Sequence, residues 1–192
     1  MIEIKLRYLV PVFTFLVLAC VAKSQEAVSG SVTINATVGQ AISISLSQEL
    51  QAGIRFGQVS PGTNNNKAIG NSGQSTNYSI QVDSSSTSPV NFWHRAAGNL
   101  MSGNNFIGLG NLTHEANTTS DGSNLVGNDG QYQLTTTYTK IGGTPGPCDN
   151  TPPNSNCYLA FWLDVPLGIP SGVYSTTYYY CANATQGTAS CD

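Results

Sequence analysis

Apolar and polar residues alternate with a period of two near the start of the chain. The even positions from 28 to 38 are apolar or small, and the odd positions are serine, threonine or asparagine. This alternation predicts a β-strand with one buried face, because successive side chains of a strand point to opposite sides. The same phase resumes after Gly39 and Gln40, so residues 28–47 form either one long strand bent at Gly39 or two strands.

Further short strands are predicted along the rest of the chain, between turn residues. Alternating, β-branched or aromatic residues mark strands at 78–82, 90–94, 134–138, 158–165 and 173–181. The segment from about 98 to 130 is rich in glycine and asparagine, which predicts long loops with one or two short strands. Its main apolar anchors are Phe106, Ile107 and Leu109.

A helix signal is nearly absent, since no window of about eleven residues has a 3.6-residue apolar period. Short strands without helices predict an all-β domain. We expect a jelly-roll or immunoglobulin-like β-sandwich of about seven to nine strands, with an N-terminal extension strand. In this organisation residues 1–24 are a secretory signal, residues 25–38 are the extension strand and residues 39–192 are the sandwich.

The signal is expected from a three-part layout. Lys5 and Arg7 supply positive charge, an apolar stretch follows, and small residues precede Gln25. The apolar stretch is about fourteen residues, whereas a membrane span needs roughly twenty. We therefore expect export to the cell surface or beyond, without a membrane span in the mature chain. An alternative interpretation is a lipoprotein signal with lipid on Cys20.

Charged residues are scarce, and the formal net charge of the whole chain is -3. The cations that follow Gln25 are Arg55, Lys67, Arg95 and Lys140. Four scattered cations cannot neutralise a run of phosphates, so we expect no nucleic-acid partner and no attraction to an anionic membrane surface.

Four cysteines remain after the expected cleavage, which predicts disulfides in an exported chain. Of the three possible connectivities we favour Cys148–Cys157 and Cys181–Cys191, because each closes a short loop. The spacings are too wide for a zinc knuckle, and no metal is expected.

No catalytic motif is present, and we predict a non-catalytic protein without a cofactor. His114 and Glu115 do not belong to an H-E-x-x-H motif, because Thr118 stands where the second histidine would be. We interpret His94 as a satisfied or exposed strand residue rather than a ligand. The carboxylates that a glycosidase pair would need show no favourable spacing: they are Asp83, Glu115 and Asp164.

Two weaker binding signals have ordinary explanations. The loop at residues 121–130 is rich in oxygen ligands, but Leu125 breaks the EF-hand spacing, so a turn is favoured over a calcium site. The aromatic residues fit a strand pattern of core and exposed positions better than a sugar platform. They are Phe92, Trp93, Phe161, Trp162, Tyr178, Tyr179 and Tyr180.

Five N-x-S/T sequons make N-linked glycans candidate partners of an exported chain. The acceptor residues are Asn35, Asn77, Asn111, Asn117 and Asn183.

Three segments carry a family resemblance: IRFGQVSPG at 54–62, FWLDVP at 161–166 and SGVY at 171–174. Together with the signal and the first strand they resemble secreted archaeal β-sandwich proteins. These include subunits of thread-type and bundling-pilus filaments, which are similar to the TasA biofilm-fibre proteins of bacteria. The resemblance implies a glycosylated jelly roll that polymerises by donor-strand complementation, in which the N-terminal strand of one copy fills a groove in the next.

The leading hypothesis is therefore a structural subunit of an extracellular filament whose partners are copies of itself. The donor residues would be Val28, Val32, Ile34, Ala36 and Val38. The alternative is a monomeric secreted adhesin or carbohydrate-binding module in which the same strand pairs within its own sheet. A secreted hydrolase is the least favoured class.

Overall fold

The computed structural model describes residues 39–72, 74–119, 130–184 and 191. The chain divides between Val38 and Gly39 into two units, and every described residue belongs to the second. The expected signal with Cys20, the extension strand, its sequon at Asn35 and most of the loop at 121–130 lie outside the described residues.

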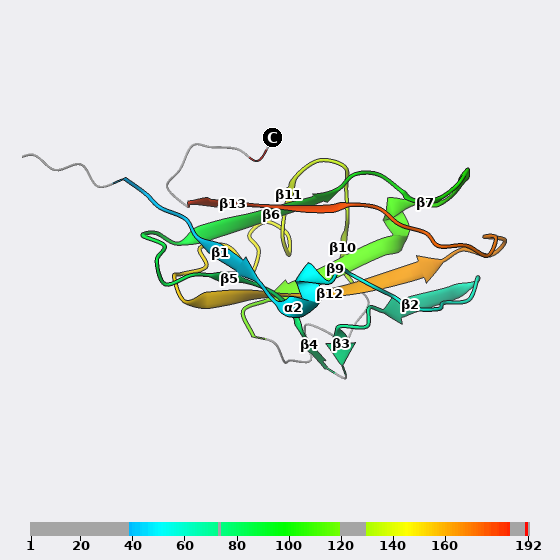
Figure 1. Cartoon of the computed structure of the whole chain (residues 1–192), viewed down its shortest axis with the longest axis horizontal. Coiled ribbons are helices and arrows are strands. Elements are labelled where there is room, and N and C mark those ends of the chain that lie inside the picture. The colour runs from blue at the N-terminus through cyan, green and yellow to red at the C-terminus, as the bar shows by residue number, and fades with distance from the viewer. Residues whose placement is uncertain (1–38, 73, 120–129, 185–190, 192) are drawn as a thin grey trace, which may run out of the picture. The chain divides into compact units, whose positions relative to one another are not determined.

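The described chain is all-β, as predicted. Its two main sheets each consist of antiparallel strands and form two layers (Figure 1). The larger sheet has the order β1 (Ile44–Leu46), β5 (Tyr78–Val82), β12 (Ser155–Val165), β9 (Leu112–Asn117) and β10 (Tyr132–Gln133), and β2 (Thr63–Lys67) also pairs with β12. The smaller sheet has the order β11 (Thr139–Lys140), β6 (Val90–Ala96) and β13 (Tyr178–Ala184).

Short elements connect these strands. Two hairpins are formed by β3 (Asn71–Ser72) with β4 (Ser75–Thr76) and by β7 (Leu100–Ser102) with β8 (Asn105–Ile107). The 3-10 helix η2 (Leu109–Asn111) precedes β9, and the short helix α2 (Gln48–Gln51) follows β1. Ser47 ends β1 and starts α2, because its hydroxyl accepts a hydrogen bond from the Leu50 N–H at 3.3 Å.

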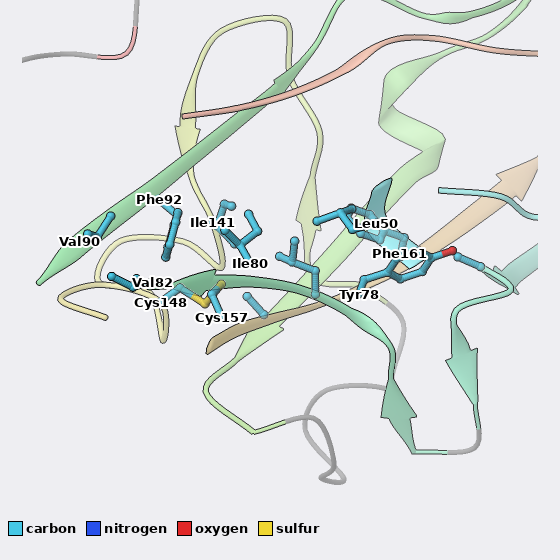
Figure 2. Packing of buried hydrophobic residues seen from close by; sticks show 13 residues of the cluster. Leu50, Tyr78, Ile80, Val82, Val90, Phe92, Ile141, Cys148, Cys157 and Phe161 are labelled. Atoms are coloured by element: carbon cyan, nitrogen blue, oxygen red, sulfur yellow. A yellow bond between two sulfur atoms is a disulfide. The ribbon is translucent and has the colours of Figure 1, made fainter. Parts of the chain in front are cut away.

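The core lies between the two layers. Tyr78, Ile80 and Phe161 from the larger sheet pack with Val90 and Phe92 from the smaller one (Figure 2). Buried and half-buried residues alternate along β5 and β6, which is the pattern that the period-two sequence predicts.

Several strand predictions are confirmed, the strand predicted at 173–181 begins only at Tyr178, and one strand prediction and one loop prediction are wrong. Strands lie at 78–82 and 90–96, and β12 covers the predicted strand at 158–165. Residues 134–138 are not a strand but the connection between β10 and β11. The segment predicted as loops contains β9, which is central in the larger sheet, and its expected anchor Phe106 is 54% exposed.

Both predicted disulfides are present. Cys148–Cys157 joins the loop before β12 to the core, with Cα atoms 5.4 Å apart, and Cys157 is fully buried. Cys181–Cys191 joins β13 to a residue near the C-terminus, with Cα atoms 6.0 Å apart. Two disulfides fit an extracellular, oxidising environment.

Within the described part of the chain, no helix is both long and apolar enough to cross a membrane.

Candidate functional site

One long side of the sandwich is closed by the chain itself. At this side the backbone passes from sheet to sheet between two adjacent residues: Leu134 N–H donates to the Leu112 carbonyl at 3.1 Å, and Ala96 N–H donates to the Thr135 carbonyl at 2.8 Å. Leu134 and Ile141, which flank this crossing, are 3% and 1% exposed. The crossing therefore seals the core between β10 and β11.

The opposite side is bordered by β1 and β13, the edge strands of the two sheets. Among the described strands, none pairs with the outer edge of either one. A side with two unpaired edges leaves both backbone hydrogen-bonding groups and core side chains uncovered.

An apolar cavity of about 590 Å³ opens between these two edges. Leu46 of β1, Leu50 of α2 and residues 53–57 of the loop that follows line it on one side, and residues 174–177 with Tyr178 and Tyr180 of β13 line it on the other. Buried leucines form its floor: Leu100, Leu112, Leu134 and Leu163. We call this feature the open groove.

Side chains beside the open groove point to the core but are incompletely covered. Tyr180 lies opposite the buried His94 in the β6–β13 register, yet it is 38% exposed. On β1, Ile44 and Leu46 lie opposite the fully buried Val82 and Ile80 but remain half-buried themselves. The groove therefore has mostly apolar walls whose core-facing side chains are only partly covered, and Arg55 is the charged residue among those that line it.

The backbone of β13 also offers hydrogen bonds to this side. Ala96 N–H donates to Thr135, and the Phe92 carbonyl accepts from Ile141 N–H, so the even-numbered residues of β6 face away from β13. The odd-numbered residues of β6 face β13, where their partners are Tyr179, Cys181 and Asn183. Since successive residues of a strand direct their N–H and C=O groups to alternate sides, the even-numbered residues of β13 direct theirs to the open groove.

A polar cluster lies behind the groove wall. The His94 and His114 rings meet edge to face, with centroids 4.1 Å apart, and both residues are buried. His94 Nδ1 lies 3.1 Å from the Tyr178 hydroxyl, which places the cluster in contact with a groove-lining residue. On the other side, His114 Nε2 accepts a long hydrogen bond of 3.5 Å from Gly142 N–H. The cluster thus connects the open side with the closed side.

Both histidines are held in the neutral form. Burial lowers the pKa of His94 to about 4. Burial also lowers the pKa of His114 well below its usual range, and the adjacent His94 lowers it further. His94 is fully buried and not exposed, and it is only partly satisfied, because its Nε2 has no hydrogen-bond partner.

A metal centre is not assembled from these rings. Among residues 39–72, 74–119, 130–184 and 191, no group of three or more His, Cys, Asp and Glu side chains is placed to hold a metal ion.

The three carboxylates considered for a glycosidase pair each have a separate polar neighbour. Asp83 accepts hydrogen bonds from Ser43 and Ser45 at 2.6 and 2.8 Å, and these bonds lower its pKa. Glu115 accepts one from Gln131 N–H at 2.9 Å, and burial raises its pKa. The Asp164 carboxylate accepts a hydrogen bond from Asn65 N–H at 2.7 Å.

The aromatic residues are divided between layers rather than gathered into one platform. Phe92 and Phe161 lie in the core, and Trp162 is buried on the other face of β12. On the outer face of the smaller sheet, Arg95 stacks on Tyr138 and Tyr179, with 5.1 and 4.2 Å between the guanidinium carbon and the ring centroids. Lys140 lies 5.8 Å from the ring centroid of the neighbouring Trp93.

The described sequons differ in accessibility. Asn77 is exposed on the approach to β5, whereas Asn111, Asn117 and Asn183 are half-buried. The Asn111 side-chain amide also donates to the Gly108 carbonyl at 3.2 Å. Asn77 is therefore the most accessible described acceptor.

No family model matches the chain, and neither the curated proteins nor the solved structures compared with it show a significant match.

The family resemblance implied a groove, but sequence reasoning did not locate it or name its residues. Its walls come from residues 46–57 and 174–180, which are far apart in the chain and meet only at the sandwich side. The one signal in the sequence is the run of three tyrosines at 178–180, which makes both faces of a strand aromatic.

Proposed function

We propose that this protein is a non-catalytic structural subunit of an extracellular filament that polymerises head to tail by donor-strand complementation. Residues 28–38 of one copy would fill the open groove of the next. The open groove carries this proposal, because it combines an apolar cavity, incompletely covered core side chains and a free strand edge. An added strand supplies main-chain hydrogen bonds and fills the pockets with alternate side chains.

The edges beside the groove lack the devices that usually block strand addition. Edge strands are commonly protected by charged residues, proline or bulges. Residues 41–47 and 173–184 contain no charged residue and no proline. By contrast, the short edge strand β11 on the closed side carries Lys140, which forms an ion pair with Asp149 at 2.9 Å.

The position of Gly39 favours donation to another copy. Ala41 hydrogen-bonds with Thr87, and Ile44 lies opposite Val82, at the end of the sandwich where β13 also finishes. From this end β1 runs along the groove. If the segment before β1 continues in the direction of β1, it leads away from the groove of its own subunit. To fill that groove, the chain would have to turn back at Gly39. Because donor and groove are different surfaces, the contact is head-to-tail and can be repeated from copy to copy along a filament.

Two substitutions in the donor strand test the proposal. Burial of a Val or Ile side chain contributes roughly 1.5–3 kcal/mol, so the double variant V32D/I34D is expected to abolish filaments in negative-stain micrographs of the purified mature protein. The matched control S31D/T33D places the same charges on the polar face and is expected to assemble. Light scattering and circular dichroism would confirm that V32D/I34D is a folded monomer.

Two results would contradict the proposal. Filaments of normal appearance from V32D/I34D would exclude the donor-strand mechanism. A wild-type protein that stays monomeric at high concentration, with residues 28–38 protected from hydrogen exchange, would favour the monomeric adhesin or carbohydrate-binding module.

N-linked glycans are part of the same proposal. We expect occupancy at two or more of the five sequons when the protein is isolated from a host that glycosylates secreted proteins. The exposed Asn77 is the first described candidate, and N77Q should remove its glycan mass. An intact mass equal to that of the bare polypeptide would refute glycosylation without affecting the filament proposal.

A further inference from the structure

We infer that the strand that fills the open groove pairs with β13 rather than with β1, that it comes from a second copy, and that its apolar side chains lie opposite Tyr178, Tyr180 and Ala182. This inference rests on the proposed function and adds the acceptor edge and the phase of pairing. Three independent features of the groove support it.

The first feature is the length of the two edges. β1 has three residues and ends where Ser47 caps α2, so only Ile44 and Leu46 direct backbone groups to its outer edge. Of these groups, the Leu46 carbonyl already accepts a hydrogen bond from the Gln51 side-chain amide at 2.8 Å. β13 has seven residues, and its line continues towards residue 175, which exchanges two backbone hydrogen bonds with Met101. Only the β13 edge is long enough to hold a strand in a continuous ladder.

The second feature is that the same alternate residues of β13 direct their backbone groups to the groove and their side chains to the core. Its even-numbered residues direct both their side chains to the core and their free N–H and C=O groups to the groove. Residues directly opposite each other on paired strands place their side chains on the same face. An added strand must therefore present apolar side chains at alternate positions opposite Tyr178, Tyr180 and Ala182.

The third feature is the chain outside the described unit. Residues 28–38 carry apolar or small residues at every even position and neutral polar residues at every odd one, so one face suits the groove and the other suits solvent. At about 3.3 Å per residue, these eleven residues span roughly 36 Å, whereas the edge from Thr176 to Ala182 spans roughly 23 Å. About four residues then remain to connect the inserted strand to Gly39 of its own subunit.

Photo-crosslinking with isotope mixing tests the inference on the full mature chain. A benzophenone amino acid replaces Tyr180, which points into the groove, and heavy-labelled and light protein are mixed before assembly. We expect crosslinks from position 180 to residues 28–38, including peptides that join heavy and light chains. The same probe at Tyr179, on the outer face of β13, is the matched control and is expected to give no such crosslink.

The outcomes separate this inference from the proposed function. Crosslinks between position 180 and residues 28–38 of the same molecule only would overturn both the second copy and the filament proposal. Filaments in which position 180 crosslinks to another segment, or to none, would overturn this inference and leave the filament proposal standing.

A proline substitution tests the acceptor edge without a probe. The Ala182 N–H faces the groove and not β6, so A182P removes no ladder hydrogen bond, and an edge strand tolerates proline at such a position. We expect A182P to remain folded and to lose filament formation. Y179P, which removes a hydrogen bond to β6, is expected to lower the melting temperature instead. Wild-type filaments from A182P would show that β13 is not the acceptor.

Discussion

The closed and open sides of the sandwich both carry apolar side chains that face the core. They differ because the backbone crosses from one sheet to the other on the closed side and not on the open side. On the closed side the backbone crosses between sheets at Leu134 and Thr135, and the neighbouring apolar side chains are buried. On the open side, Tyr180 points to the same core yet is 38% exposed. Whether an apolar side chain is buried therefore depends on whether neighbouring backbone covers it, and its residue type alone does not determine its exposure.

This difference has a consequence for association. A buried apolar residue on the closed side stabilises the single subunit, because its surroundings are complete before any partner binds. An apolar residue at the open groove contributes most when a further strand covers it. Substitutions on the two sides should consequently affect different measurements.

The largest expected effect on subunit stability is on the closed side. Ile141 is 1% exposed, and I141A should lower the free energy of unfolding by about 2–5 kcal/mol, because truncation removes buried contacts and leaves a cavity. Y180A at the groove should lower it by less than I141A does, because Tyr180 is 38% exposed, but it should weaken assembly. Urea unfolding of both variants in the V32D/I34D background separates stability from assembly. Equal losses of unfolding free energy would refute the comparison.

The sequence allowed prediction of those features that depend on local pattern. Tyr78, Ile80 and Val82 alternate with polar residues, and this period of two predicts β5 directly. The two disulfides followed from short spacing, because residues about ten positions apart meet across a single loop.

Features that depend on distant contacts were not predictable. β9 holds His114 and Glu115, both buried, and polar residues at such positions hide a central strand from any hydrophobic pattern. Phe106 was expected in the core because of its type, but it lies in the β7–β8 hairpin and is exposed. The open groove needs the sheet order itself, since only that order makes β1 and β13 edges of the same side.

A smaller effect is expected from acid, through the histidine cluster that joins the two sides. Unfolding frees both rings, and an exposed histidine has a pKa near 6.5, above the folded value of about 4 for His94. The unfolded state therefore binds more protons between these values, and stability is fully present above about pH 6.5 and is lost as the pH falls. For His94 alone the loss at pH 5 is about 2 kcal/mol, and His114 acts in the same direction.

Two carboxylates also affect how stability depends on pH. The raised pKa of Glu115 works in the opposite direction, because the folded state then binds the proton more readily. The lowered pKa of Asp83 adds a loss of stability only as the pH falls below about 4. Between pH 7 and pH 5 the two histidines therefore dominate, since burial prevents both from charging in the folded state.

Unfolding titrations of the monomeric V32D/I34D background at pH 7 and pH 5 measure this loss. The further variant H94Q/H114Q removes both titrating groups and is expected to flatten the pH dependence, even if its stability at pH 7 is lower. An unchanged dependence in H94Q/H114Q would assign the acid sensitivity to other groups.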